Sequence, residues 1–261
     1  MEAPLYFFKV FTHDAQAGNP AACALLAEWS ESALLQRIAY EVQQVVTAFV
    51  VPTTDNPYQF QIRWFSCQQE INLCGHGTFA AAALLRQLKG EGRYTFLSPY
   101  GEPQVTVSTG ELVMQLPQWP ATPVQWPAAL ACVEVLDAFQ TRDLVLVLKD
   151  QQAVQQFEPD AELIRQLPQH ALIVTAFSPP DTYVLRYFAP AIGIEEDIAT
   201  GSAQCSLAPY WAAKTGLSSF KVLQLPATPA SFAVTIQSGQ LYLKTQAVAV
   251  PHLIRSVVTM S

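Results

Sequence analysis

Short runs rich in β-branched and aromatic residues recur along the whole chain, and turn residues separate them at short intervals. Two of the turns read Ser108-Thr109-Gly110 and Gln237-Ser238-Gly239. Such runs predict strands, and their short connections favour largely antiparallel sheets that curl. The predicted strands are residues 5–11, 47–51, 59–65, 94–97, 104–108, 111–116, 143–148, 171–177, 182–188, 221–225, 231–236 and 240–244.

Helical periodicity is found in fewer places. Residues 30–44 open with Ser30 as a candidate cap and carry apolar residues along one face, and residues 160–167 predict a surface helix. Residues 78–88 and 202–215 are apolar on nearly every face, and a helix that is apolar all round must be buried. We therefore expect an α/β (α+β) fold with two similar lobes, each a curved, mostly antiparallel sheet wrapped around a central apolar helix.

Prolines indicate where the lobes divide. Four prolines lie between residues 117 and 127, where they block regular helix and central strand. The sequence thus predicts an N-terminal lobe over residues 1–117, a Pro-rich linker over 118–127 and a C-terminal lobe over 128–245. The tail, residues 246–261, could return to the first lobe.

Composition narrows the function classes. Apolar residues make up 51% of the chain and charged residues 13%, which is ample for a core and argues against disorder. The net charge of -7 gives no reason to expect nucleic acid. No run reaches the roughly 18 apolar residues that span a bilayer, so no membrane association is expected. The start lacks a basic signal-peptide region, and five cysteines without CxxC spacing read as free thiols, so a cytoplasmic location is expected.

Two loops share one design. Residues 73–78 and 199–203 each set glycine among small polar residues directly before an Ala-rich apolar run. Glycine permits close backbone approach, and a helix start offers unpaired N–H groups and positive dipole. The pair of loops predicts two lobes that hold one small anionic metabolite between them.

Three side chains in and beside these loops are candidates for chemistry. His76 could move a proton near neutral pH, or it could merely cap or pack. Asp197 ends the triplet Glu195-Glu196-Asp197, which could supply a carboxylate for proton transfer or form a solvated acidic turn. Ser202 could bind a substrate carboxylate or cap the helix that follows.

Thiol and metal chemistry are disfavoured. A racemase with two opposed thiols would need a cysteine beside Thr200-Gly201 to match Cys74, but Cys205 lies one helical turn later, so both thiols are interpreted as buried small hydrophobes. The histidines at 13, 76, 170 and 252 are isolated, so no metal is expected. No nucleotide-binding glycine motif or cofactor lysine is recognised, so no cofactor is expected.

Taken together, motifs in a fixed order resemble the PhzF-like (phenazine biosynthesis) family, which shares its fold with diaminopimelate epimerase. They are residues 17–22, 63–65, 70–78, 173–176, 186–190 and 193–203. The resemblance implies two α/β lobes with the site between them, cofactor-independent isomerisation by proton movement on a small carboxylic or amino-acid-like acid, and a homodimer. It assigns catalysis to His76, Asp197 and Ser202, and substrate binding to Gly75, Gly77, Thr78, Gly201, Thr200 and Asn19.

One position departs from the family. The stretch whose glutamate is the family's main acid/base reads Val45-Val46-Thr47-Ala48-Phe49 here, with Val46 at the glutamate position. A general acid–base group is typically worth about 10²–10⁴ in rate. Two hypotheses follow: an isomerase of altered mechanism, in which His76 and Asp197 exchange a proton with the bound acid, or a small-acid binding protein without turnover. A purely structural role would explain neither glycine loop.

Overall fold

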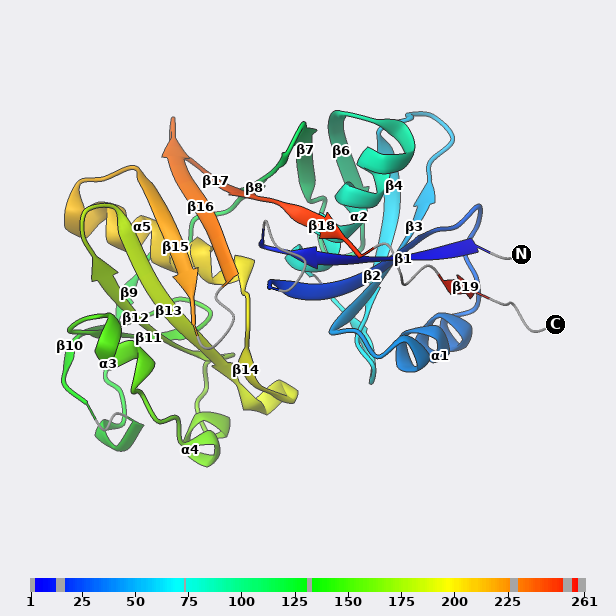
Figure 1. Ribbon diagram of the computed structural model, residues 1–261. Helices are drawn as coiled ribbons and strands as arrows, with labels where there is room; N and C mark the ends of the chain where they lie inside the picture. Colours follow the sequence, from blue (N-terminus) through cyan, green and yellow to red (C-terminus); the bar gives the residue numbers. More distant parts are fainter. Residues whose placement is uncertain are drawn as a thin grey trace. The chain divides into compact units, whose positions relative to one another are not determined.

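A computed structural model gives the structure of the protein (Figure 1). It describes residues 3–12, 17–72, 74–130, 133–225 and 230–250, and the backbone of 255–257; His13, Leu73, Cys132, His252 and residues 226–229 lie outside these ranges. The chain divides into two compact units, which are described separately. The first comprises Met1–Gln115 with Lys244–Ser261, and the second comprises Leu116–Leu243.

The strands of the first unit pair in chain order. They are β1 (Ala3–Val10), β2 (Asn19–Leu25), β3 (Val46–Pro52), β4 (Gln59–Phe65), β6 (Gly92–Leu97), β7 (Gln104–Ser108) and β8 (Glu111–Leu116). The pairs β2–β3 and β4–β6 are parallel and the others antiparallel. The short β5 (Glu70–Ile71) adds to β4, while β18 (Ala247–Ala249) and β19 (Arg255–Val257) both pair with β1.

Helix α2 (Gly75–Lys89) is the buried element of the first unit. Its residues 76–85 are all buried, and it contacts β1, β2, β3, β6 and β7 (Figure 1). This confirms the prediction that an all-round apolar helix is wrapped by its sheet. Because alternate strand residues point to opposite faces, Phe49 and Phe65 instead pack with helix α1 (Ser32–Val42).

The prediction that Ser30 caps helix α1 is wrong. The N-cap residue is Glu31, and its side chain makes no capping hydrogen bond. Ser32 stands inside the helix, and its hydroxyl accepts a hydrogen bond from Arg63 at 2.8 Å. The Ser32 hydroxyl thus joins α1 to Arg63 of the neighbouring strand β4.

The second unit repeats the alternation of the first. Its strands pair in chain order as β10 (Val135–Gln140), β11 (Leu144–Leu148), β12 (Leu172–Ser178), β13 (Thr182–Ala189), β15 (Ser219–Gln224) and β16 (Ala230–Gln237). Again the second and fourth pairs, β11–β12 and β13–β15, are parallel. The short β14 (Ile194–Asp197) adds to β13 as β5 adds to β4.

Two further strands complete the second unit. Strand β9 (Thr122–Pro123) pairs with β10, so part of the Pro-rich segment belongs to this sheet. Strand β17 (Gln240–Thr245) follows β16 after a turn in which Ser238 and Gly239 both have positive φ, as a tight hairpin turn requires.

Helix α5 (Gln204–Thr215) is the apolar helix of the second unit, and the 3-10 turn η3 (Gly201–Ala203) leads into it. Tyr210 stacks on Phe139 with ring centroids 4.4 Å apart, and Trp211 donates its indole hydrogen to Thr175 at 3.2 Å. Short helices α3 (Gln151–Gln155) and α4 (Ala161–Arg165) and the 3-10 turns η1 (Ala128–Leu130) and η2 (Pro190–Ile192) lie elsewhere in this unit.

Each predicted strand coincides with an observed strand to within a few residues, and both units are dominated by sheet. The longer strands β2 and β10 were not predicted, nor were the short strands β5, β9, β14, β18 and β19. Strand β2 is rich in alanine, which does not favour strand. The triplet that could have formed a solvated turn instead lies in β14. Among the described residues, no helix is long and apolar enough to cross a membrane.

Candidate functional site

His76 lies in the first turn of α2, with 9% of its surface exposed. Its Nε2 is 3.3 Å from the carbonyl oxygen of Pro20, which can only accept, so Nε2 carries the proton. Its Nδ1 faces the Cys74 thiol at 3.5 Å. Burial lowers the pKa of His76 to about 4, and the hydrogen bond to Pro20 opposes this only in part. The imidazole is therefore neutral at physiological pH.

The two glycines that flank His76 have different surroundings. A Cβ on Gly75 would meet no atom within 4 Å, whereas a Cβ on Gly77 would lie 2.7 Å from Trp64 Cδ1 and 3.3 Å from both methyl groups of Val46. Val46 is wholly buried at this contact. Val46, where the resemblance implies a glutamate, thus packs against the helix start as part of the apolar core.

The remaining candidates in the first unit hold the loop together. Thr78 is wholly buried, and both its hydroxyl (2.8 Å) and its backbone N–H (3.0 Å) donate to the carbonyl oxygen of Cys74. Asn19 is wholly buried at the start of β2. Cys74 itself is only half-buried, so its interpretation as a buried hydrophobe is wrong; that of Cys205, which is buried, is confirmed.

Asp197 ends β14 in the second unit and is half-buried. Its Oδ2 accepts the hydroxyl of Thr200 at 2.6 Å, and its Oδ1 accepts the backbone N–H of Ala199 at 3.2 Å. Gln224 supports the same loop, because its amide group bonds the Asp197 carbonyl at 2.7 Å and the Thr200 N–H at 2.6 Å. Thr200 therefore orients the carboxylate, and Asp197 is held in one position.

Ser202 lies within η3, after Gly201, and makes no helix cap; its hydroxyl accepts from Arg142 Nη2 at 3.2 Å. The same nitrogen lies 3.1 Å from the Tyr187 hydroxyl, and Arg142 also forms a two-pronged ion pair with the wholly buried Asp143. Burial raises the pKa of Tyr187, and the charges of Asp143 and Asp197 raise it further, so this phenol stays neutral. The structure thus gathers Arg142, Tyr187 and Ser202 near Asp197.

Sequence reasoning missed Arg142, Tyr187 and Gln224. The available signal for Arg142 is its position beside Asp143, directly before an uninterrupted apolar strand in a chain with few charges. Within the residues that the structure describes, no group of three or more His, Cys, Asp or Glu side chains could hold a metal ion.

A family model described as phenazine biosynthesis-like protein matches residues 8–251. An uncharacterized isomerase of Vibrio cholerae is 42% identical over 230 residues, which are 87% of this chain and 81% of that protein. A solved PhzF-family phenazine biosynthesis protein of Enterococcus faecalis is 29% identical, with a TM-score of 0.89 over 95% of this chain and 97% of that one.

A more distant likeness concerns the fold alone. A hydroxyproline epimerase of Agrobacterium vitis, solved with trans-4-hydroxy-L-proline, has a TM-score of 0.61 at 9% identity, covering 100% of this chain and 93% of that chain. The predicted mixed α/β, epimerase-like fold is thereby confirmed.

Proposed function

The chain belongs to the phenazine biosynthesis-like protein family, as its motifs predict, and we propose that it is a cofactor-independent isomerase acting on a small carboxylic or amino-acid-like metabolite. The name of the Vibrio cholerae relative supports the reaction class. The two glycine loops, each leading into a buried helix, support an anionic substrate. The family resemblance assigns His76, Asp197 and Ser202 to the reaction.

The fixed carboxylate of Asp197 is the observation that carries the proposal. Two hydrogen bonds hold its oxygens in place, yet the side chain is only half-buried and remains reachable. A positioned carboxylate can take a proton from carbon beside a substrate carboxyl group and return it to another carbon. A single base then suffices, which matters because Val46 supplies no second carboxylate.

His76 has a different part in this mechanism. With a pKa near 4 it is neutral and is a weak proton acceptor at pH 7. We assign it to binding at the start of α2, where the N-cap residue makes no side-chain capping hydrogen bond and backbone N–H groups favour an anion. Ser202 is assigned to a hydrogen bond with the substrate. This revises the hypothesis that His76 and Asp197 exchange the proton as equals.

The second candidate function is small-acid binding without turnover. The complete burial of Val46 against Gly77 favours it, because the position of the family's main acid/base lies in packed apolar core. Such a protein would bind acids and leave their carbon-bound protons unexchanged.

Proton exchange in D2O decides between the two. The protein is incubated with a panel of α-amino acids and cyclic dienoic amino acids, and loss of carbon-bound ¹H is followed by NMR. Wild-type protein is expected to exchange a proton in at least one compound, and Asp197→Asn to slow this by about 10²–10⁴-fold. Glu195→Gln is the control, since this exposed carboxylate pairs with Arg165 on the surface. Saturable binding without exchange would instead support the binding protein.

The expected homodimer forms part of the proposal. Sedimentation velocity at micromolar concentration is expected to give a mass near twice the 28.7 kDa of one chain. A single species of one-chain mass would remove this part and leave the isomerase proposal intact.

A further inference from the structure

Arg142 combines a compensated charge with unused donors. Its Nε and Nη2 donate to the two oxygens of Asp143 at 3.0 and 2.9 Å, and Nη2 also reaches the hydroxyls of Tyr187 and Ser202. Within the described ranges of the chain, no acceptor takes a hydrogen bond from Nη1. The side chain is 39% exposed, and Nη1 is the guanidinium nitrogen that has no acceptor among the described residues.

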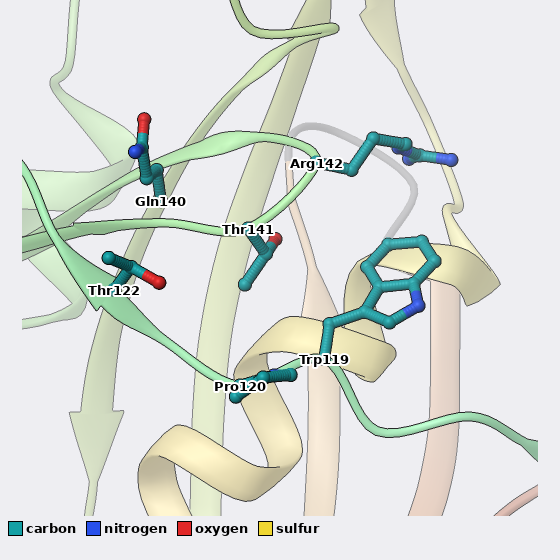
Figure 2. A pocket seen from close by; sticks show the side chains of 6 residues that line it. All are labelled: Trp119, Pro120, Thr122, Gln140, Thr141 and Arg142. Atoms are coloured by element: carbon teal, nitrogen blue, oxygen red, sulfur yellow. The ribbon is translucent and has the colours of Figure 1, made fainter.

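Arg142 also lines a hollow in the surface of the second unit. Figure 2 shows its lining, in which the Arg142 guanidinium lies beside the indole of Trp119. The hollow has a volume of about 370 Å³ and is lined by Trp119, Pro120, Thr122, Gln140, Thr141 and Arg142. The guanidinium carbon is 5.0 Å from the centroid of the indole ring, within the range of a cation–π contact.

The lining is held in place by neighbours of the second unit. The backbone N–H of Trp119 donates to the carbonyl of Cys205 at 2.8 Å, which fastens the Pro-rich segment to α5. The hydroxyl of Thr141 shares a hydrogen bond with Ser206 at 2.7 Å, and Gln140 Oε1 accepts from Gln169 at 2.7 Å. A site whose groups are already positioned loses little entropy when a ligand binds.

The chemistry of the lining selects the ligand. Each N–H group of Nη1 can donate a charge-assisted hydrogen bond to a carboxylate oxygen, and the indole with Pro120 offers apolar contact to a flat body. The buried Asp143 already neutralises the guanidinium charge, so a dianion would gain little attraction from the pair. We propose that this hollow binds the carboxylate of a small acid with a flat, unsaturated body, with Arg142 Nη1 on the carboxylate and Trp119 against the ring.

This inference does not rest on the proposed function, because it concerns binding alone. Arg142 contacts Ser202, so occupancy of the hollow would place an acid beside the helix start to which catalysis is assigned. The test therefore uses a probe that cannot isomerise. Its outcome stands whether or not the protein exchanges protons in D2O.

Benzoate is the probe, and its binding to the full chain is measured by isothermal titration and by the NMR shift of the Trp119 indole N–H. Benzamide has the same shape without charge, cyclohexanecarboxylate has the charge without the flat ring, and phenyl phosphate adds a second charge. Benzoate is expected to bind saturably at least tenfold more tightly than benzamide and several-fold more tightly than the other two, and to shift the Trp119 signal. Equal affinity for benzoate and benzamide, or no saturable binding, would overturn the proposal without any variant.

Variants identify the residue. Arg142→Lys keeps a charge beside Asp143, but one ammonium group cannot both pair with Asp143 and lie where Nη1 lies, so benzoate is expected to bind at least tenfold more weakly. The double change Arg142→Gln with Asp143→Asn avoids leaving a buried charge unpaired and should weaken it as much. Arg165→Gln is the matched control, because Arg165 is 37% exposed and also ion-paired, and it should bind as wild type. Unchanged affinity in Arg142→Lys would refute the assignment.

Discussion

Both units contain the same arginine–glutamate ion pair, here called the clamp. In each, an arginine on the fourth main strand forms a two-pronged ion pair with a glutamate on the short strand that follows: Arg63 with Glu70, and Arg186 with Glu196. Each guanidinium also lies over a phenylalanine two residues along, at 5.1 Å in the first unit and 4.9 Å in the second. With the repeated order of parallel and antiparallel pairs, this indicates one scaffold used twice.

The starts of the two buried helices differ sharply. At α2 the surroundings are apolar, with Val46 and Trp64 packed on Gly77 and a neutral His76 above them. At η3 and α5 the surroundings are polar and charged, with Arg142, Asp143 and Asp197 in one neighbourhood. The two units therefore share the strand order and the clamp, while the side chains around the start of the buried helix differ in polarity and charge.

Variants of the two clamps should give the largest difference in unfolding free energy, because the clamps differ in burial. Arg186 is 11% exposed and also donates to the carbonyls of Val154, Gln155 and Phe157, whereas Arg63 is 22% exposed and its partner 40%. Arg186→Met should cost about 3–5 kcal/mol, since it leaves buried acceptors and a carboxylate unpaired. Arg63→Met should cost about 1 kcal/mol or less. Urea unfolding measures both, and equal losses would contradict the role given to burial.

The pH dependence of stability should give the next largest effect, at His76 in the start of α2. The pKa of His76 is lowered to about 4 in the folded state, below the ordinary value of 6.5, so the unfolded chain binds the proton more readily. Stability from this residue is present above pH 6.5 and is lost as pH falls toward 4, to a total of about 3 kcal/mol. The difference in unfolding free energy between wild type and His76→Gln, followed from pH 7.5 to 4, should shrink by that amount. A constant difference would show that burial does not perturb the imidazole.

The glycines at the same place provide a matched pair. Gly77→Ala must push Trp64 or the strand beneath it, and overpacking of this kind costs about 1–3 kcal/mol. Gly75→Ala meets open space two residues away and should be neutral or stabilising by up to about 1 kcal/mol, because alanine is the better helix former. Urea unfolding should therefore show a loss of stability for Gly77→Ala and none for Gly75→Ala. Equal destabilisation would mean that α2 does not seat on Val46 and Trp64.

Local pattern was sufficient for most of the fold. The main strands and the buried helices follow from β-branched runs and all-round apolarity, which depend only on neighbouring residues. Strand β2 was not predicted because its alanines do not favour strand. It is a strand because it pairs with β1 on one side and β3 on the other. The acidic triplet similarly became a strand because β13 offers it an edge.

Some residues of the candidate site likewise follow from local sequence, and others are brought together only by the fold. Asp197 and Ser202 could be named from a motif that is continuous in sequence. Arg142 could not, because its partners Tyr187 and Ser202 are 45 and 60 residues away, and only the folded second unit brings them to one nitrogen. The resemblance likewise places a glutamate where Val46 stands, but the packing of Val46 on Gly77 depends on the seating of α2.

Helix caps give the smallest contrast between the units. Asp160 caps α4 of the second unit, accepting the backbone N–H groups of Glu162 and Leu163 at 3.0 Å each, while Glu31 at the start of α1 caps nothing. Asp160→Ala should thus cost about 1 kcal/mol, and Glu31→Ala almost none. The backbone of Glu31, at φ -53° and ψ 136°, is already extended as a cap requires, so Glu31→Ser should gain about 0.5 kcal/mol by supplying the missing acceptor. Differences of this size are resolved by urea unfolding of the three variants side by side. A loss on Glu31→Ser would show that its carboxylate, through the helix dipole, already does what a hydroxyl cap would do.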